Sequence, residues 1–305
     1  MANRLEAAVC NNKGRKRGNN EDNFYLSGSY MKLETMDNGG VFTANRPGGI
    51  QLYAVCDGMG GAESGEKASF HAVETLSLYH EAMTGEVEDE RLVSLLRRIS
   101  DTLYDEATRN GIRSGTTIVL CVWNNGEMRC LHVGDSRIYL LSDGKLTQVT
   151  QDHSEVQRLV SLNLMTPEQA KVDPGRHVIS QYLGMNTEDI PLAPSLWGPV
   201  RCKPGDTFLL CSDGLTDMVE DDVIAEILQA APTPKAASER LVQKALENGG
   251  VDNVTCMCLR VARGKSSLPD KLRHALRPRK LMRVGGTILG VAALCCLLEL
   301  LFRMF

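Results

Sequence analysis

Acidic residues at the ends of apolar segments are the side chains of this sequence best suited to chemistry. The stretch "YAVCDGMGG" runs from a strand-like segment straight into Asp57 and a glycine-rich turn. Glycines at such a turn let the backbone approach an ion or a phosphate closely. Further acids stand in comparable positions, and these are Glu21, Asp22, Asp135, Asp213, Asp217 and Asp252.

Each of these acids taken singly has a simpler explanation, because Asp commonly caps helices and occupies turns. The sequence holds an internal comparison in Asp143-Gly144, which lies between two alternating stretches and predicts a tight hairpin. Asp57-Gly58 differs, because the residues after it have a helical pattern of apolar positions. An acid at a strand-to-helix junction is a candidate ligand, provided that partner acids lie near it.

The set of acids indicates a metal centre if the strand ends meet at one edge of a sheet. Clustered carboxylates repel one another unless cations lie among them. Oxygen ligands without His or Cys favour Mg²⁺ or Mn²⁺ over zinc. Two such ions can bridge a water and direct the resulting hydroxide at phosphorus, while the guanidinium of Arg17 could clamp the phosphate oxygens. The residues alone therefore predict metal-assisted phosphoester hydrolysis.

The elements that would position these acids follow from apolar periodicity. Strands are expected at 5–10, 23–27, 50–56, 116–123, 127–133, 137–141, 206–211 and 253–261. Helices are expected at 66–83, 91–109, 153–162, 167–170, 220–231 and 234–248. Strands at both ends of the region, with helices between them, predict a single α+β domain over residues 1–262.

The composition is that of a globular protein from a reducing compartment. Hydrophobic residues make up 43% and charged residues 24% of the chain. Cysteines such as Cys121 and Cys256 lie within apolar strand-like runs, and no CxxC pair occurs, which favours buried free thiols and argues against a zinc site. Residues 1–262 hold 25 basic and 36 acidic side chains, and this acidic balance argues against nucleic-acid binding.

The C-terminal region differs from the rest in charge and hydropathy. Residues 263–305 contain nine Lys or Arg and two acids, and 284–302 form a nineteen-residue run with Glu299 as its one charge. At about 1.5 Å per residue, a helix of this length just crosses a bilayer core of about 30 Å. Basic residues immediately before such a run are typical of the cytoplasmic side. The sequence predicts a basic linker at 263–283, one transmembrane helix at 284–302 and a domain held in the cytoplasm at a membrane.

Eight motifs follow one another along residues 5–262. They are "RKRGNNED", "VCDGMGG", "SGTT", "HVGDSRIYLL", "LTQVTQDHS", "ISQYLG", "LLCSDGLTDMV" and "DNVT". With its motifs in this order, the chain resembles the metal-dependent Ser/Thr protein phosphatases of type 2C, particularly their bacterial branch. The resemblance implies hydrolysis of phosphoserine and phosphothreonine in proteins by a hydroxide that bridges two metal ions. It also implies a four-layer αββα sandwich, with two antiparallel β-sheets flanked by helices.

The resemblance further implies a dinuclear centre of Mn²⁺ or Mg²⁺. Asp57 would bridge the two ions, with the Gly58 carbonyl on one of them. Asp213 and Asp252 would bind the other ion. Arg17 would hold the phosphate of the substrate.

Other acids have supporting roles in this resemblance. Glu21 and Asp22 would support the centre mostly through bound waters. Asp135 and Asp217, with Asp213, match the acids that hold a third, weaker ion in bacterial members.

The chain departs from parts of the family pattern. Animal-type members carry His two residues after the bridging Asp, whereas this chain and bacterial members have Met, here Met59, so protonation of the leaving group falls to a metal-bound water or another group. Residues 29–49 look long and predict a solvated excursion, and 154–178 match the variable flap beside the cleft. His132 is predicted to be a core residue and His153 a residue that orders a loop.

The same residues bear on alternative functions. A membrane-tethered pseudophosphatase or phosphoprotein-binding regulator would tolerate loss of Asp57, Asp213 or Asp252, and all three are present. A two-metal phosphoesterase acting on nucleotides or nucleic acid is disfavoured by the acidic body and by the ordered motifs. The expected partners are phosphorylated Ser/Thr proteins, a cognate kinase and its substrates, and a membrane, with no nucleic acid.

Overall fold

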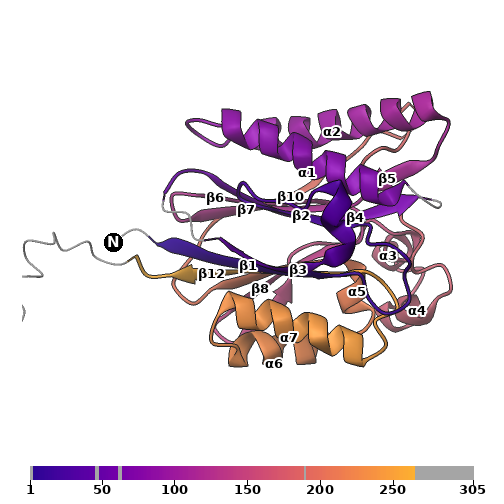
Figure 1. The fold of residues 1–305 in the computed structure, drawn as a ribbon. Helices are drawn as coiled ribbons and strands as arrows, with labels where there is room; N and C mark the ends of the chain where they lie inside the picture. The colour runs from indigo at the N-terminus through magenta and orange to yellow at the C-terminus, as the bar shows by residue number, and fades with distance from the viewer. Residues whose placement is uncertain (1–2, 45–47, 61–63, 189, 265–305) are drawn as a thin grey trace, which may run out of the picture. The chain divides into compact units, whose positions relative to one another are not determined.

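The computed structural model describes residues 3–44, 48–60, 64–188 and 190–264. These residues belong to one compact unit, Met1–Gly264. Two antiparallel sheets are stacked face to face, and helices cover the outer face of each sheet (Figure 1). The predicted α+β sandwich of two antiparallel sheets with flanking helices is thereby confirmed for this unit.

The first sheet has six strands in the order β3-β1-β12-β11-β8-β9. Its strands are β1 (Arg4–Asn12), β3 (Gly40–Ala44), β8 (Arg137–Ser142), β9 (Lys145–Gln148), β11 (Thr207–Cys211) and β12 (Val254–Ala262). Strands β1 and β12 pair along their whole length, from Arg4 opposite Ala262 to Asn12 opposite Val254. The end of β1 and the start of β12 therefore lie side by side at the same end of the strands.

The second sheet has the order β10-β7-β6-β4-β2, with β5 paired to β4. Its strands are β2 (Asp22–Leu26), β4 (Gln51–Gly60), β5 (Ser114–Thr116), β6 (Ile118–Asn124), β7 (Glu127–Val133) and β10 (Ser195–Arg201). In the register between β2 and β4, Asp22 lies directly opposite Asp57. Two of the predicted site acids are thus neighbours through backbone pairing.

The helices form the outer layers because each has one apolar face. Helices α1 (Gly65–Ala82) and α2 (Asp89–Asn110) cover the second sheet, while α6 (Asp221–Ala230) and α7 (Pro234–Glu247) cover the first (Figure 1). The buried face of α2 carries Leu92, Leu96, Ile99 and Leu103, three or four residues apart. The short elements are the 3₁₀ helix η1 (Leu33–Asn38), α3 (Glu155–Ser161), α4 (Pro167–Val172) and α5 (Asp213–Thr216).

Apolar side chains fill three layers of this sandwich. The layer between the sheets includes Phe24, Tyr53 and Phe208, all fully buried. The other two layers lie between each sheet and its helices, around Leu120 and Leu209. Complete burial of a side chain of this size contributes about 1.5–3 kcal/mol. The strands are therefore well anchored, and so are the residues at their ends.

Most of the elements expected from the sequence are present within a few residues of their predicted bounds. The hairpin expected at Asp143-Gly144 joins β8 to β9, with positive φ angles of 51° and 77° at its two turn residues. The thiols of all eight described cysteines are free and buried, as predicted.

The prediction of a solvated excursion at 29–49 is confirmed for most of the described residues of that segment, which are exposed, including most of β3. Two methionines depart from it. Met31 and Met36 are buried against the inter-sheet layer, and β3 extends the first sheet by pairing with β1. The ring of Phe42 in β3 lies 5.0 Å from that of Phe24. The few apolar residues that anchor this polar segment are spaced irregularly along it, so the sequence pattern did not reveal them.

The predicted transmembrane helix at 284–302 lies outside the described residues, as does the predicted linker beyond Gly264. Within the described ranges, no helix combines the length and the apolar character needed to span a bilayer.

Candidate metal centre

Asp57 lies near the end of β4, where neighbouring segments hold its backbone. The Asp57 amide donates to Thr117 Oγ1 at 3.1 Å. The Asp57 carbonyl accepts from the Thr117 amide at 2.8 Å and from Thr116 Oγ1 at 2.9 Å. The "SGTT" motif therefore positions Asp57, a role that the sequence did not reveal.

Gly58 allows three segments to meet beside Asp57. A Cβ atom at Gly58 would lie 2.1 Å from the Gly65 carbonyl oxygen and 2.6 Å from that of Glu21. The Gly58 amide donates to the Glu21 carbonyl at 3.1 Å. Only glycine fits this contact without a backbone shift, and the contact brings Glu21 and the start of α1 next to β4.

Asp213 and Asp217 lie one helical turn apart at the end of β11. The Asp217 amide donates to the Asp213 carbonyl at 2.8 Å. A Cβ atom at Gly214 would lie 1.9 Å from the Asn253 carbonyl oxygen. This close backbone approach brings α5 against the loop that carries Asp252.

The Asp252 loop is tied to the loop that carries Arg17. Arg17 Nη2 donates to Asp252 Oδ2 at 2.7 Å. The side chain of Asn253 donates to the Asn19 carbonyl at 3.0 Å and accepts from the Glu21 amide at 2.8 Å. One asparagine thus links the two loops through hydrogen bonds that the sequence did not predict.

These segments surround a cavity of about 620 Å³. Predicted site residues that line it are Arg17, Glu21, Asp57, Gly58, Asp135, Asp213, Asp217 and Asp252. The structure thus brings together, from distant parts of the chain, all but one of the residues that the sequence predicted for the site. The exception is Asp22.

Asp22 lies behind the cavity wall and is fully buried. Its Oδ2 accepts from Ser212 Oγ and from Thr255 Oγ1, each at 2.7 Å. Its Oδ1 is buried without a hydrogen-bond partner among the described residues. Burial raises the pKa of Asp22 to about 7. We therefore assign Asp22 to a layer beneath the cavity, oriented by two hydroxyl groups.

The acids in the cavity wall make ionisation costly for one another. Burial raises the pKa of Asp57 well above its ordinary value, and the charges of Asp22 and Asp213 raise it further. Burial likewise raises the pKa of Asp213, and the charges of Asp135 and Asp252 raise it further. Positive charge inside the cavity would relieve this repulsion.

Divalent cations fit this donor set. Six carboxylates line the cavity, whereas Arg17, Arg176 and His177 are the basic side chains in its wall. Carboxylate-rich sites with few nitrogen donors suit Mg²⁺ and Mn²⁺. The unpartnered Oδ1 of Asp22 is a further acceptor beneath the wall, within the same group of charges.

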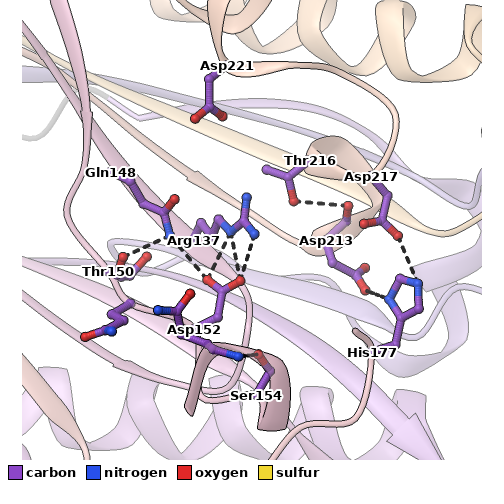
Figure 2. A network of polar contacts seen from close by, with 12 residues as sticks. Arg137, Gln148, Thr150, Asp152, Ser154, His177, Asp213, Thr216, Asp217 and Asp221 are labelled. Atoms are coloured by element: carbon purple, nitrogen blue, oxygen red, sulfur yellow. Dashed lines mark hydrogen bonds and ion pairs between the residues drawn. The ribbon is translucent and has the colours of Figure 1, made fainter. Parts of the chain in front are cut away.

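Asp135 lies between β7 and β8, two residues before Arg137, which forms an ion pair with Asp152 (Figure 2). Arg137 donates to Asp152 through Nη2 at 2.7 Å and through Nε at 3.0 Å. Such a bidentate pair fixes both geometry and orientation. It joins β8 to the residues just before α3. The pKa of Asp135 is raised to about 6, mainly by burial and secondly by the charge of Asp152.

His132 and His153 are outside the cavity lining. The ring of His132 is buried and hydrogen-bonded through Nε2 to the Gln151 carbonyl at 2.8 Å. His153 Nε2 lies 2.9 Å from Ser195 Oγ, and the two histidine rings are 4.4 Å apart. These contacts match the structural roles predicted for both histidines.

The flap contributes to the cavity through Arg176 and His177, which follow α4, and Ile179 lines the cavity directly after the flap. The sequence indicated the flap as a segment but none of these side chains. Its local signals were Pro167, Pro174 and Gly175, which predict a loop without indicating which side chains line the cavity.

A second cavity of about 710 Å³ lies between α1 and α2, beside β5. Its lining includes Lys67, His71 and Arg113 and the single carboxylate of Glu106. It lacks a cluster of acids, so the chemistry described above belongs to the first cavity.

Comparison with known proteins gives a consistent result. A family model described as protein phosphatase 2C matches residues 26–172. The chain is 34% identical over 255 residues to the serine/threonine protein phosphatase PstP of Mycobacterium tuberculosis, which covers 82% of this chain but only 44% of PstP. It is 34% identical over 232 residues to the serine/threonine phosphatase stp of Listeria monocytogenes, covering 72% of this chain and 88% of that protein.

Solved structures show the same similarity. A crystal structure of M. tuberculosis PstP has a TM-score of 0.71 and 33% identity, covering 85% of this chain and all of that one. A structure of the PstP catalytic domain in complex with two manganese ions has a TM-score of 0.69 and 31% identity, covering 86% of this chain and all of that one.

Proposed function

The chain belongs to the protein phosphatase 2C family of metal-dependent Ser/Thr phosphatases, and from this premise we propose that it removes phosphate from phosphoserine and phosphothreonine in proteins. The observation that carries the proposal is the cavity whose wall gathers six carboxylates from distant segments. The family's dependence on Mn²⁺ or Mg²⁺ fits this donor set.

Asp57, Asp213 and Asp252, together with the Gly58 carbonyl, would hold two cations in this cavity. When bound, such ions lower the pKa of water and stabilise the charge that develops on phosphate. Asp135, Asp213 and Asp217 are the residues that would hold a third ion. Thr116 and Thr117 act through Asp57, because their hydrogen bonds fix its backbone.

Arg17 would bind the substrate phosphate at the mouth of the cavity. Its side chain is about half exposed, and the one described partner is Asp252. The remaining guanidinium donors can therefore point to phosphate oxygens. A cation beside Asp252 would weaken the existing ion pair and favour this second role.

The retained acids also bear on a binding-only alternative. A pseudophosphatase or phosphoprotein-binding regulator would have no need for Asp57, Asp213 and Asp252 to line one cavity. Their convergence favours turnover. The substrate proteins and a cognate kinase remain part of the proposal.

We further propose that residues 284–302 anchor the protein in a membrane, with the catalytic unit in the cytoplasm. The support is the apolar nineteen-residue run and the basic residues that precede it.

Hydrolysis of phosphoserine and phosphothreonine peptides by the purified protein tests the enzymatic proposal. We expect activity with Mn²⁺ or Mg²⁺, none with a chelator, and a loss of two or more orders of magnitude in Asp57→Asn, about 3 kcal/mol of lost stabilisation. Asp143→Asn is a matched control, because Asp143 occupies a hairpin turn outside the cavity. Full activity in a chelator, or in Asp57→Asn, would reject the proposal.

A further inference from the structure

His177, on the flap, lies between two of the predicted metal ligands (Figure 2). Its Nδ1 is 3.9 Å from Asp213 Oδ2, and its Nε2 is 3.7 Å from Asp217 Oδ2. Both distances exceed those of a hydrogen bond, about 2.7–3.2 Å. The ring therefore faces the two carboxylates without being bonded to either.

The three side chains converge on one point. A ligand atom of each lies within 4.8 Å of a ligand atom of the other two, and no other group of His, Cys, Asp or Glu among the described residues meets this condition. Metal–ligand bonds of about 2.1 Å separate neighbouring ligand atoms by roughly 3.0–3.4 Å. Displacements of less than about 1 Å would close the site around an ion.

His71 provides a contrast within the same chain. It also has two acidic neighbours, with Nδ1 3.8 Å from Glu74 and Nε2 3.4 Å from Glu106. These three residues do not form a convergent group. Two nearby carboxylates are therefore insufficient, and it is the mutual approach of Asp213, Asp217 and His177 that distinguishes the flap histidine.

The backbone positions of all three residues are fixed from several sides. Asp213 and Asp217 share the turn of α5. The Val178 amide donates to the Gly175 carbonyl at 2.9 Å, and the Glu155 amide donates to the Val178 carbonyl at 3.0 Å. These bonds hold the His177 backbone in place and leave its exposed side chain able to adjust.

We propose that His177 is a nitrogen ligand of a divalent cation bound with Asp213 and Asp217, and that this bond ties the flap to the metal centre. The proposal rests on the metal centre proposed above and goes beyond it by adding a flap side chain to the third site. An imidazole with two carboxylates favours Mn²⁺ or Zn²⁺ over Mg²⁺, because Mg²⁺ prefers oxygen ligands. Whether the flap is held at the metal centre would then depend on which ion is bound.

Manganese binding by the full-length protein in detergent tests this assignment without relying on turnover. Free Mn²⁺ is measured by electron paramagnetic resonance during a titration, and nitrogen ligation by the ¹⁴N modulation of the bound ion. The variants are His177→Gln and, as the matched control, His71→Gln. Amide hydrogen exchange of residues 175–179 reports on the flap.

We expect ¹⁴N coupling in the wild type and in His71→Gln, and its loss in His177→Gln. In His177→Gln the weakest Mn²⁺ should bind at least tenfold less tightly, while the two tighter ions remain. Mn²⁺ should slow amide exchange of the flap in the wild type and in His71→Gln, but not in His177→Gln. Retained coupling in His177→Gln, or two-ion binding without coupling in the wild type, would overturn the assignment. A wild type that binds no Mn²⁺ would overturn the proposed metal centre as well.

Discussion

Arg17 Nη2 lies 2.7 Å from Asp252 Oδ2, so the side chain predicted to bind phosphate is paired with a carboxylate predicted to bind metal. Both side chains are partly exposed, which limits the contribution of the pair to folding stability. The pair links the Arg17 loop to the cavity and holds the guanidinium where a phosphate would arrive.

Replacing Arg17 should weaken substrate binding more than it slows chemistry. A hydrogen bond to a charged group contributes about 1.5–3 kcal/mol, so Arg17→Ala should raise KM about 10- to 100-fold with a smaller change in kcat. Steady-state kinetics with a phosphopeptide measures both. Lys16→Ala, which alters an exposed neighbour outside the cavity lining, should leave both constants unchanged. An unchanged KM in Arg17→Ala would contradict the assigned role.

The burial of Asp135, together with the charge of Asp152, should make the metal-free protein sensitive to pH. Asp135 has an ordinary pKa of 3.8 and a folded-state pKa of about 6. Between these values the unfolded chain releases a proton that the folded chain retains, so the free energy of unfolding falls as pH rises.

Asp135→Asn removes this contribution and keeps the size of the side chain. Compared with the wild type in a chelator, its relative stability should grow from about pH 4 to about pH 6 and then level off. Denaturant unfolding at a series of pH values measures the difference. A difference that stays constant across this range would show that Asp135 ionises normally.

The contact at Gly214 should be intolerant of any side chain. A Cβ atom there would lie 1.9 Å from a backbone carbonyl oxygen, so Gly214→Ala forces a backbone shift with a cost of about 1–3 kcal/mol. Because the shift moves Asp213 relative to Asp252, phosphatase activity should fall as well. Gly18→Ala is the control, since no atom lies within 4 Å of its added Cβ. Equal stability of the two variants would refute the packing argument.

Removing residues 263–305 tests the membrane proposal. The last strand ends at Ala262 and the compact unit at Gly264, so the shortened protein should fold, remain in the supernatant after ultracentrifugation and keep full activity on phosphopeptides. The full-length protein should sediment with membranes. Sedimentation of the truncated form, or its loss of activity, would contradict the predicted tether.

Most acids of the site could be predicted because they follow or precede an apolar strand, and Asp217 because it lies four residues after Asp213. Asp57 and Asp143 have the same local pair, Asp-Gly, yet one lies in the cavity and the other in a hairpin. The pattern of the following residues was enough to separate them. The family was predicted from the order of the motifs, and the comparisons confirm it.

Other features could not be predicted because they depend on contacts between distant segments. Asp22 resembles Glu21 in sequence, but backbone pairing with β4 turns it beneath the cavity. Strand β10 contains Gly198-Pro199 and an irregular register against β7, which obscures its alternation. Asn253 and His177 act through side-chain positions that no local pattern encodes.

The full-length pairing of β1 with β12 has a consequence for access. Strand β12 starts beside Asp252 and ends at Ala262, roughly 30 Å further along at the usual rise of a strand. Whatever follows Ala262 is attached at the end of the sheet remote from the acids. A bulky phosphoprotein can therefore approach the mouth of the cavity without meeting the chain at the point where it leaves the sheet.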